Sequence, residues 1–349
     1  MSRVVSMPVA EWPEADAFMW QRLTVEGGPL DEGGALAHLR EASLNKLRYE
    51  YGRWLEWLFQ SQAHALAEPP AARATVERLL CFVEALGHVA PMTRLMLVEG
   101  PLRVISAAAP YEDWSKAFRL REILRRNARA TFGTRKNGRV LSSAVLLKAG
   151  LKLAGAGAEV ASTPLESARR RRDGTMVAFL TLLPMRRRAF AELRIGSSVC
   201  ITLDCIVVSL SGAMTKNHLP WEAAVPHVIE PALRRYIDEV RPFLMARRGA
   251  EHDFLWVNEY GWPFDLISLS LRFRQVTLRA TGVPISPHLF RDAAATTLSR
   301  LSPENARLIR PLLAHSSYET AERHYIQAQG IETGRDYASV LAALKGEQR

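Results

Sequence analysis

Apolar residues recur at helical spacing along most of this 349-residue chain, and that periodicity restricts the chain to a mainly helical fold. Between residues 44 and 58 they line one face of a helix, and similar faces occur within 76–86, 95–105 and 114–124. These four segments predict a small all-helical domain. A single block of β-branched residues, Val199–Leu210, predicts two short strands. The expected fold class is therefore mainly α with a small β-sheet.

Glycines interrupt the helical periodicity in two regions and suggest how the chain is divided. Those near residues 27–34 predict an arm or loop at 1–35, and those between 133 and 157 predict a linker or domain edge at 131–160. Two domains remain, one at 36–130 and one at 161–349 with a C-terminal tail. The second contains a buried helix that is expected to begin after Asp173-Gly174. A chain of this length can form two ordinary cores.

The charge balance favours a polyanionic partner. Lys and Arg outnumber Asp and Glu by 46 to 36, which gives a net charge of +10 and a pI near 9.8. Nucleic acid fits this excess, because each basic residue placed on a phosphate releases a counterion; an ordinary basic enzyme would show the same balance. Candidate DNA contacts are Arg135, Lys136 and Arg139 in one cluster and Arg170 and Arg171 in another, although solvated surface is the commoner meaning of such clusters.

Several classes of protein are disfavoured. The cysteines Cys81, Cys200 and Cys205 are odd in number and lack CxxC spacing, so neither a disulfide framework nor a zinc site is indicated. The longest mainly apolar window, 176–185, includes Pro184 and is half the length of about twenty residues that a membrane-spanning helix needs. The first residues do not show a secretion signal. We expect a cytoplasmic protein without a metal, a cofactor or a membrane partner.

The first chemical motif lies at the start of a predicted helix. Ser286 is a good N-cap and Pro287 a good first helical residue, which places His288 and Arg291 in the first turns. Residues three apart share a helix face, and the helix N-terminus adds free N–H groups and a positive dipole. The arrangement suits a phosphate.

A second motif follows about 25 residues later. Ser316 and Glu319 form a capping-box pattern, so a helix should begin just after His315 and carry Tyr325 two to three turns in. A simpler interpretation is also open: Tyr318 and Tyr325 have a spacing that suits two core aromatics, and His315 could form hydrogen bonds at a helix end.

Residues 286–325 as a whole resemble the C-terminal motif of the tyrosine recombinases, the phage integrase family. Pro287–Thr296 is similar to the His-x-x-Arg helix of that family. Leu312–Ser317 is similar to its Leu-Leu-Gly-His-Ser-Ser segment, with Ala314 in place of Gly, and Thr320–Tyr325 to the segment that ends in the nucleophilic tyrosine.

The family also has an earlier arginine, and the segment 183–193 resembles the part of the family that carries it. Arg186 is the matching position, while Arg187 and Arg188 offer neighbouring registers. An acidic residue often stands three positions after this arginine, but here the position is Ala189. The orienting carboxylate is therefore missing or is supplied by Glu192.

The family places a catalytic lysine on a β-hairpin, and Met214–His218 looks like its Thr-Lys-Asn turn, with Lys216 as the lysine. The resemblance implies that 36–130 is an α-helical core-binding domain that contacts DNA. It further implies that 161–349 is an α+β catalytic domain. The similarity is specific only from about residue 165 to residue 328.

The resemblance implies a metal-free reaction on DNA. Tyr325 would attack the scissile phosphorus and form a 3′-phosphotyrosyl bond, while Arg186 and Arg291 hold the non-bridging oxygens. Lys216 would protonate the leaving 5′ oxygen. The first histidine would act as base or hydrogen-bond partner near the tyrosine, and the second would donate to a phosphate oxygen. The six candidate catalytic residues are Arg186, Lys216, His288, Arg291, His315 and Tyr325.

The function expected is that of a site-specific recombinase or integrase acting on double-stranded DNA. Four copies would act on two DNA sites, with DNA-bending accessory proteins as optional partners. The segment 338–344 could dock on a neighbouring copy or pack on its own domain. Two alternatives are a type IB topoisomerase-like enzyme, which relaxes one duplex, and a DNA-binding protein that has lost catalysis, for which Ala189 is the sequence argument.

Overall fold

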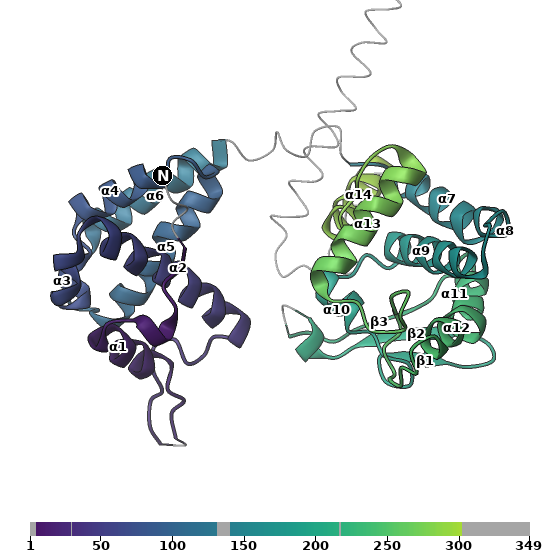
Figure 1. Ribbon diagram of the computed structural model, residues 1–349, viewed down its shortest axis with the longest axis horizontal. Coiled ribbons are helices and arrows are strands. Elements are labelled where there is room, and N and C mark those ends of the chain that lie inside the picture. Colours follow the sequence, from purple (N-terminus) through teal and green to yellow (C-terminus); the bar gives the residue numbers. More distant parts are fainter. Residues whose placement is uncertain (1–4, 29, 131–139, 216–217, 302–349) are drawn as a thin grey trace, which may run out of the picture. The chain divides into compact units, whose positions relative to one another are not determined.

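The computed structural model describes residues 5–28, 30–130, 140–215 and 218–301, and it divides the chain into two units, Met1–Arg135 and Lys136–Arg349. Figure 1 shows the helices and strands of the two units. Each unit has its own hydrophobic core. Within the described ranges, no helix is both long and apolar enough to cross a membrane. The mainly helical fold with a small sheet is confirmed.

The first unit consists of helices packed around α2. Tyr51, Trp54 and Leu55 of α2 are fully buried, and Trp54 stacks on Trp57 with 5.2 Å between ring centroids. The four predicted helices are present as α2, α4, α5 and α6. The described helices of this unit are η1 (Val9–Glu11), α1 (Glu14–Thr24), α2 (Glu41–Ser61), η2 (Ala63–Ala67), α3 (Pro70–Arg73), α4 (Val76–Ala85), α5 (Pro91–Ala108) and α6 (Ser115–Ala130).

The expectation of an arm or loop at residues 1–35 is wrong for much of that segment, because α1 lies within it. Trp20 is buried in the core of the first unit. Asp16, fully buried on the same helix, accepts hydrogen bonds from Tyr51 of α2 and, at 2.6 Å, from Arg73 of α3. These contacts join α1 to residues far along the chain. Such contacts do not produce an apolar periodicity within the segment itself, so the sequence did not predict the helix.

The second unit places a small antiparallel sheet beside helices. The sheet has the order β1-β2-β3, with Val199 opposite Val208 and Leu210 opposite Trp221. The two predicted strands are present, and β3 was not predicted. The described elements of this unit are α7 (Ser143–Ala154), α8 (Ala156–Glu159), α9 (Pro164–Leu182), α10 (Arg187–Ala191), β1 (Val199–Ile201), β2 (Ile206–Leu210), η4 (Gly212–Met214), β3 (Trp221–Ala224), α11 (Glu230–Arg235), η5 (Tyr236–Val240), α12 (Arg241–Ala246), α13 (Leu266–Thr281) and α14 (Pro287–Leu301).

Helices α7 and α9 cross at two glycines, and this crossing corrects two expectations. A Cβ added to Gly174 would lie 2.5 Å from the carbonyl oxygen of Gly150, and closer still to the backbone nitrogen of Ala154. Gly150 is therefore part of a packed helix, so the expected linker at 131–160 is wrong from residue 143 onward. Gly174 lies inside α9, which begins at Pro164 after the Thr163 N-cap and not after Asp173-Gly174.

Candidate active site

The segment that follows α9 is joined to α14 by a buried hydrogen bond. Arg291, in the second turn of α14, donates from Nη1 to the carbonyl oxygen of Pro184 at 2.6 Å. Its side chain is buried, as is Asp292 beside it. The bond fixes the predicted His-x-x-Arg helix against the segment that carries the predicted earlier arginine.

Two guanidinium groups are brought together at this junction. Arg186 is half-buried at the N-cap of α10, and burial lowers its pKa. Burial, and then the nearby positive charge of Arg186, lower the pKa of Arg291 to about 10, while Asp292 acts in the opposite direction. Two like charges that have lost part of their hydration favour an anion between them. A phosphate with two non-bridging oxygens matches such a pair.

The neighbouring arginines have other contacts, which favours Arg186 as the register. Arg187 is exposed and donates to Ser270 Oγ at 2.9 Å. Arg188 is exposed and forms an ion pair with Glu192 at 2.7 Å, so this carboxylate serves Arg188. Ala189 is buried. Within the described residues, Asp292 is the carboxylate whose charge acts on Arg291, and it raises the pKa of that arginine.

His288 is exposed in the first turn of α14 and lies three residues before Arg291 on the same side of the helix. The helix begins at Pro287, as predicted, and the N–H of Leu289 donates to the carbonyl oxygen of Ser286 at 2.9 Å. The imidazole and the guanidinium therefore project from one helix end, where the dipole favours an anion.

The expected lysine belongs to the connection between β2 and β3. Next to it, Thr215 is buried, and its Oγ1 lies 2.8 Å from the carbonyl oxygen of Leu219 and 3.1 Å from that of Gly212, which closes the base of the turn. The antiparallel pairing of β2 with β3 supports the expected hairpin. Six predicted residues lie outside the described ranges: Lys216, His315, Tyr325, Arg135, Lys136 and Arg139.

The other two candidate DNA contacts have partners within the second unit. Arg170 donates from Nη1 to the carbonyl oxygen of Gly157 at 2.6 Å and forms an ion pair with Glu166. Arg171 donates to the carbonyl oxygen of Ala154 at 3.2 Å. Both side chains thus tie the first half of α9 to the ends of α7 and α8, and a DNA contact by them stays a prediction.

Sequence reasoning missed a buried ionic cluster that links α9 to α13. Arg172 is fully buried and donates to Asp173 Oδ1 from Nε at 3.0 Å and from Nη2 at 2.8 Å. Arg272 binds both oxygens of Asp173, and these contacts outweigh burial and raise the pKa of Arg272. The signal in the sequence is an Arg-Asp pair directly before the apolar run 176–185, and the sequence alone does not show that both side chains are buried.

Metal-ligating side chains do not gather in this part of the structure: within the described residues, no group of three or more His, Cys, Asp or Glu side chains could hold an ion. The described part of the site is two arginines and a histidine at the starts of α10 and α14.

Part of the second unit is similar in sequence to known proteins. Residues 159–330 match the model of the phage integrase family. The tyrosine recombinase XerC of Lacticaseibacillus casei (strain BL23) is 30% identical over 158 residues, covering 42% of this chain and 52% of that protein. The tyrosine recombinase XerD of Chlorobaculum tepidum is 29% identical over 147 residues, covering 42% of this chain and 45% of that protein. The chain spans about half the length of the curated relatives it matches.

Two solved structures share the fold. The XerH site-specific recombinase bound to a palindromic difH substrate, in a post-cleavage complex, superposes with a TM-score of 0.57 at 13% identity, covering 86% of this chain and 80% of that chain. The Tn1549 transposon integrase in complex with circular intermediate DNA superposes with a TM-score of 0.56 at 13% identity, covering 94% of this chain and 99% of that chain. The fold is therefore of the tyrosine recombinase class. Residues 159–330 of the chain are similar to the domain that defines the phage integrase family.

Proposed function

We propose that the protein is a tyrosine site-specific recombinase that cuts and rejoins double-stranded DNA through a 3′-phosphotyrosyl intermediate. The observation that carries this proposal is the Arg186–Arg291 pair. It comes from two elements more than a hundred residues apart, it lies in the family domain, and both pKa values are lowered by burial. Paired, desolvated guanidiniums next to a helix N-terminus are suited to a phosphate diester.

In the reaction, Arg186 and Arg291 neutralise the non-bridging oxygens and stabilise the charge that develops on them. The Tyr325 hydroxyl gives up its proton, with His288 as base or hydrogen-bond partner, and attacks the phosphorus. The bond to the 5′ oxygen breaks, and that oxygen takes a proton from Lys216. The phosphotyrosyl bond keeps the energy of the broken bond, so the reverse attack by a 5′ hydroxyl rejoins a strand.

The remaining histidine, His315, donates a hydrogen bond to a phosphate oxygen in this scheme. The first unit supplies a second DNA-contacting body, and together with the catalytic unit it binds the duplex mainly through phosphates. Exchange between two duplexes requires four copies, one for each strand that is cut. Such an enzyme acts on DNA in the cytoplasm, with or without accessory proteins that bend the site.

A covalent-adduct assay tests the proposal. The full chain is incubated in EDTA with DNA that spans the flanks of its own gene, denatured, and resolved for DNA-linked protein. We expect an adduct with the wild type and none with Tyr325→Phe, whose DNA affinity should stay within about twofold because only the nucleophile is lost. Tyr318→Phe is the matched control and should form the adduct at the wild-type rate.

Arg291→Ala extends the test to the arginine pair. Removal of a group that stabilises transition-state charge typically lowers the rate about 10²–10³-fold, and a comparable loss of adduct formation is expected here. An adduct with Tyr325→Phe would refute the nucleophile, and an undiminished rate with Arg291→Ala would refute the phosphate role. Relaxation of supercoiled DNA without strand exchange would instead identify a topoisomerase.

A further inference from the structure

The second unit has a cavity of about 480 Å³ that the proposed reaction does not use. It lies between the first half of α9, the second half of α13 and the end of α7. Its apolar wall is formed by Leu153, Val276 and Ala280. Its charged lining consists of Glu166, Arg169, Arg170, Asp173, Arg272 and Arg279.

The cavity is separate from the paired arginines of the candidate active site. Arg169 lies in the second turn of α9, whereas Pro184 and Arg186 follow the end of that helix at Leu182. At a rise of about 1.5 Å per residue, the helix between these points is roughly 20 Å long. The two arginine groups therefore lie toward opposite ends of α9 and cannot bind one phosphate.

The cavity contains an excess of positive charge. Four arginines face two carboxylates, and both carboxylates already have partners. Asp173 is bound by Arg172 and by Arg272. Glu166 is paired with Arg170, which is the main reason that its pKa is lowered, and it accepts a hydrogen bond from the Ser162 N–H at 3.3 Å.

The other two arginines carry the unmatched charge. Arg169 is half-buried and Arg279 is exposed, and neither has a hydrogen bond or ion pair with any residue that the structure describes. The charge of Arg169 contributes to the lowered pKa of Glu166, but less than the hydrogen bond from Arg170 does. The guanidinium groups of Arg169 and Arg279 line the same cavity from α9 and from α13. An incoming anion would therefore find donors that do not have to give up another partner.

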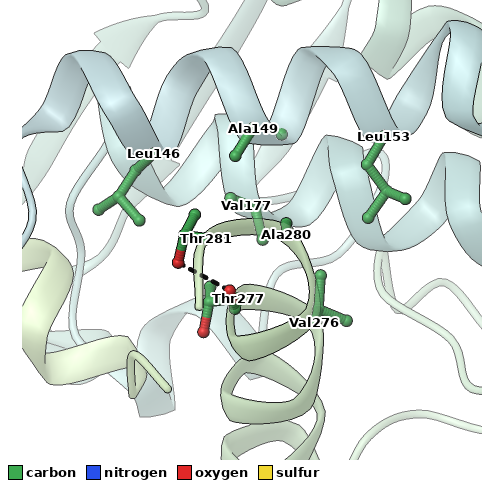
Figure 2. Close-up of a pocket in the computed structure, with 9 residues that line it drawn as sticks. Leu146, Ala149, Leu153, Val177, Val276, Thr277, Ala280 and Thr281 are labelled. Carbon is green, nitrogen blue, oxygen red and sulfur yellow. Dashed lines mark hydrogen bonds between the residues drawn. The ribbon is translucent and has the colours of Figure 1, made fainter. Parts of the chain in front are cut away.

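The apolar wall continues beyond the charged part of the cavity. Leu153, Val276 and Ala280 also border the seam between α7 and α13, which is lined further along by Leu146, Ala149 and neighbouring side chains (Figure 2). A ligand that filled the space would thus place an anionic group on the arginines and a less polar part against this wall. Cavities of about 300–1,000 Å³ hold small organic ligands, so the volume exceeds what a bare phosphate needs.

We propose that this cavity is a second anion site, which binds the phosphate group of a nucleotide. Guanidinium forks match phosphate oxygens in planar, bidentate geometry. The apolar wall receives the sugar or base. The nucleotide comes either from free solution or from the backbone of bound DNA, and the chemistry at the arginines is the same in both cases.

Titration of the full chain with adenosine 5′-monophosphate, followed by calorimetry, tests the first source. We expect binding that Arg169→Gln and Arg279→Gln each weaken about tenfold or more, because each removes a charged hydrogen bond to phosphate. Arg274→Gln is the matched control: it removes an exposed arginine from the same helix α13, outside the cavity lining, and should leave the affinity unchanged. Thermal melts check that all variants are folded.

DNA binding as a function of salt tests the second source. If the backbone supplies the phosphate, the nucleotide will not bind at millimolar concentration, but Arg279→Gln will weaken DNA binding and reduce the magnitude of the salt slope by about one, whereas Arg274→Gln will not. Absence of both effects, or equal effects of Arg274→Gln, would overturn the proposal. The nucleotide titration does not depend on recombinase activity, so its outcome is independent of the adduct assay.

Discussion

At the residue scale, the Arg186–Arg291 pair opposes folding while it prepares the site for an anion. The two positive charges repel each other, and burial lowers the pKa of both groups. Because the pKa of Arg291 in the folded chain is about 10, below its ordinary value, its charged form opposes folding at neutral pH. This cost decreases as the pH rises above about 10, where the folded chain loses the proton before the unfolded chain does.

Arg186→Gln should therefore raise the stability of the free protein while abolishing DNA cleavage. Removing one of two adjacent like charges relieves repulsion, and such changes at active sites typically stabilise by about 0.5–2 kcal/mol. Denaturant unfolding of the free protein measures the effect. Arg188→Gln, which breaks an exposed ion pair with Glu192, is the control and should change stability by less than about 1 kcal/mol. A clear loss of stability in Arg186→Gln would show that this arginine has a structural role instead.

The sequence was sufficient to name Arg186, His288 and Arg291 as candidates, because the first is in a family-like segment and the others share a helix turn. Their catalytic roles stay predictions. It could not show that Glu192 pairs with Arg188 or that Asp292 acts on Arg291. Those facts depend on where side chains of separate elements meet, and spacing along one segment does not contain that information.

At the scale of elements, the crossing of α7 and α9 depends on the absence of two side chains. The two helices approach so closely that a methyl group on Gly174 would meet backbone atoms of α7 and not a flexible side chain. Backbone atoms cannot move aside without shifting the helix. Since α9 leads directly to Pro184 and Arg186, any shift is passed on to the arginine pair.

Gly174→Ala is expected to destabilise the protein in spite of the higher helix propensity of alanine. Overpacking typically costs about 1–3 kcal/mol, which exceeds the roughly 1 kcal/mol that alanine gains over glycine inside a helix. Thermal unfolding should show a lower Tm. The control is Ser167→Ala. Ser167 lies in the same helix, its hydroxyl has no hydrogen bond to any residue that the structure describes, and its loss should change stability by less than about 0.5 kcal/mol. Unchanged stability of Gly174→Ala would mean that the helices separate at no cost.

The elements that sequence analysis missed depend on contacts between separate segments and not on a local sequence pattern. Gly150 and Gly174 were interpreted as breaks, because glycine usually marks turns, but here they permit contact between helices. Strand β3 contains Glu222, Ala223 and Ala224, residues with weak β propensity, and it exists because it pairs with β2. Long helices with a clear apolar face, such as α2, were predicted because their signal is local.

At the scale of the whole molecule, the two units have separate cores, and this organisation predicts that the first unit folds alone. Residues 5–130, expressed by themselves, should unfold in one cooperative transition, because α2 packs tryptophans 54 and 57 against Phe82 within that unit. Circular dichroism during denaturant unfolding measures the transition. In this fragment Trp54→Ala should cost about 3–5 kcal/mol, since the ring is fully buried, whereas Phe59→Ala, at a position that is 57% exposed, should cost less than about 1 kcal/mol. A fragment that unfolds without cooperativity would show that this core needs the rest of the chain, and the first unit could then not act as an independent DNA-binding body.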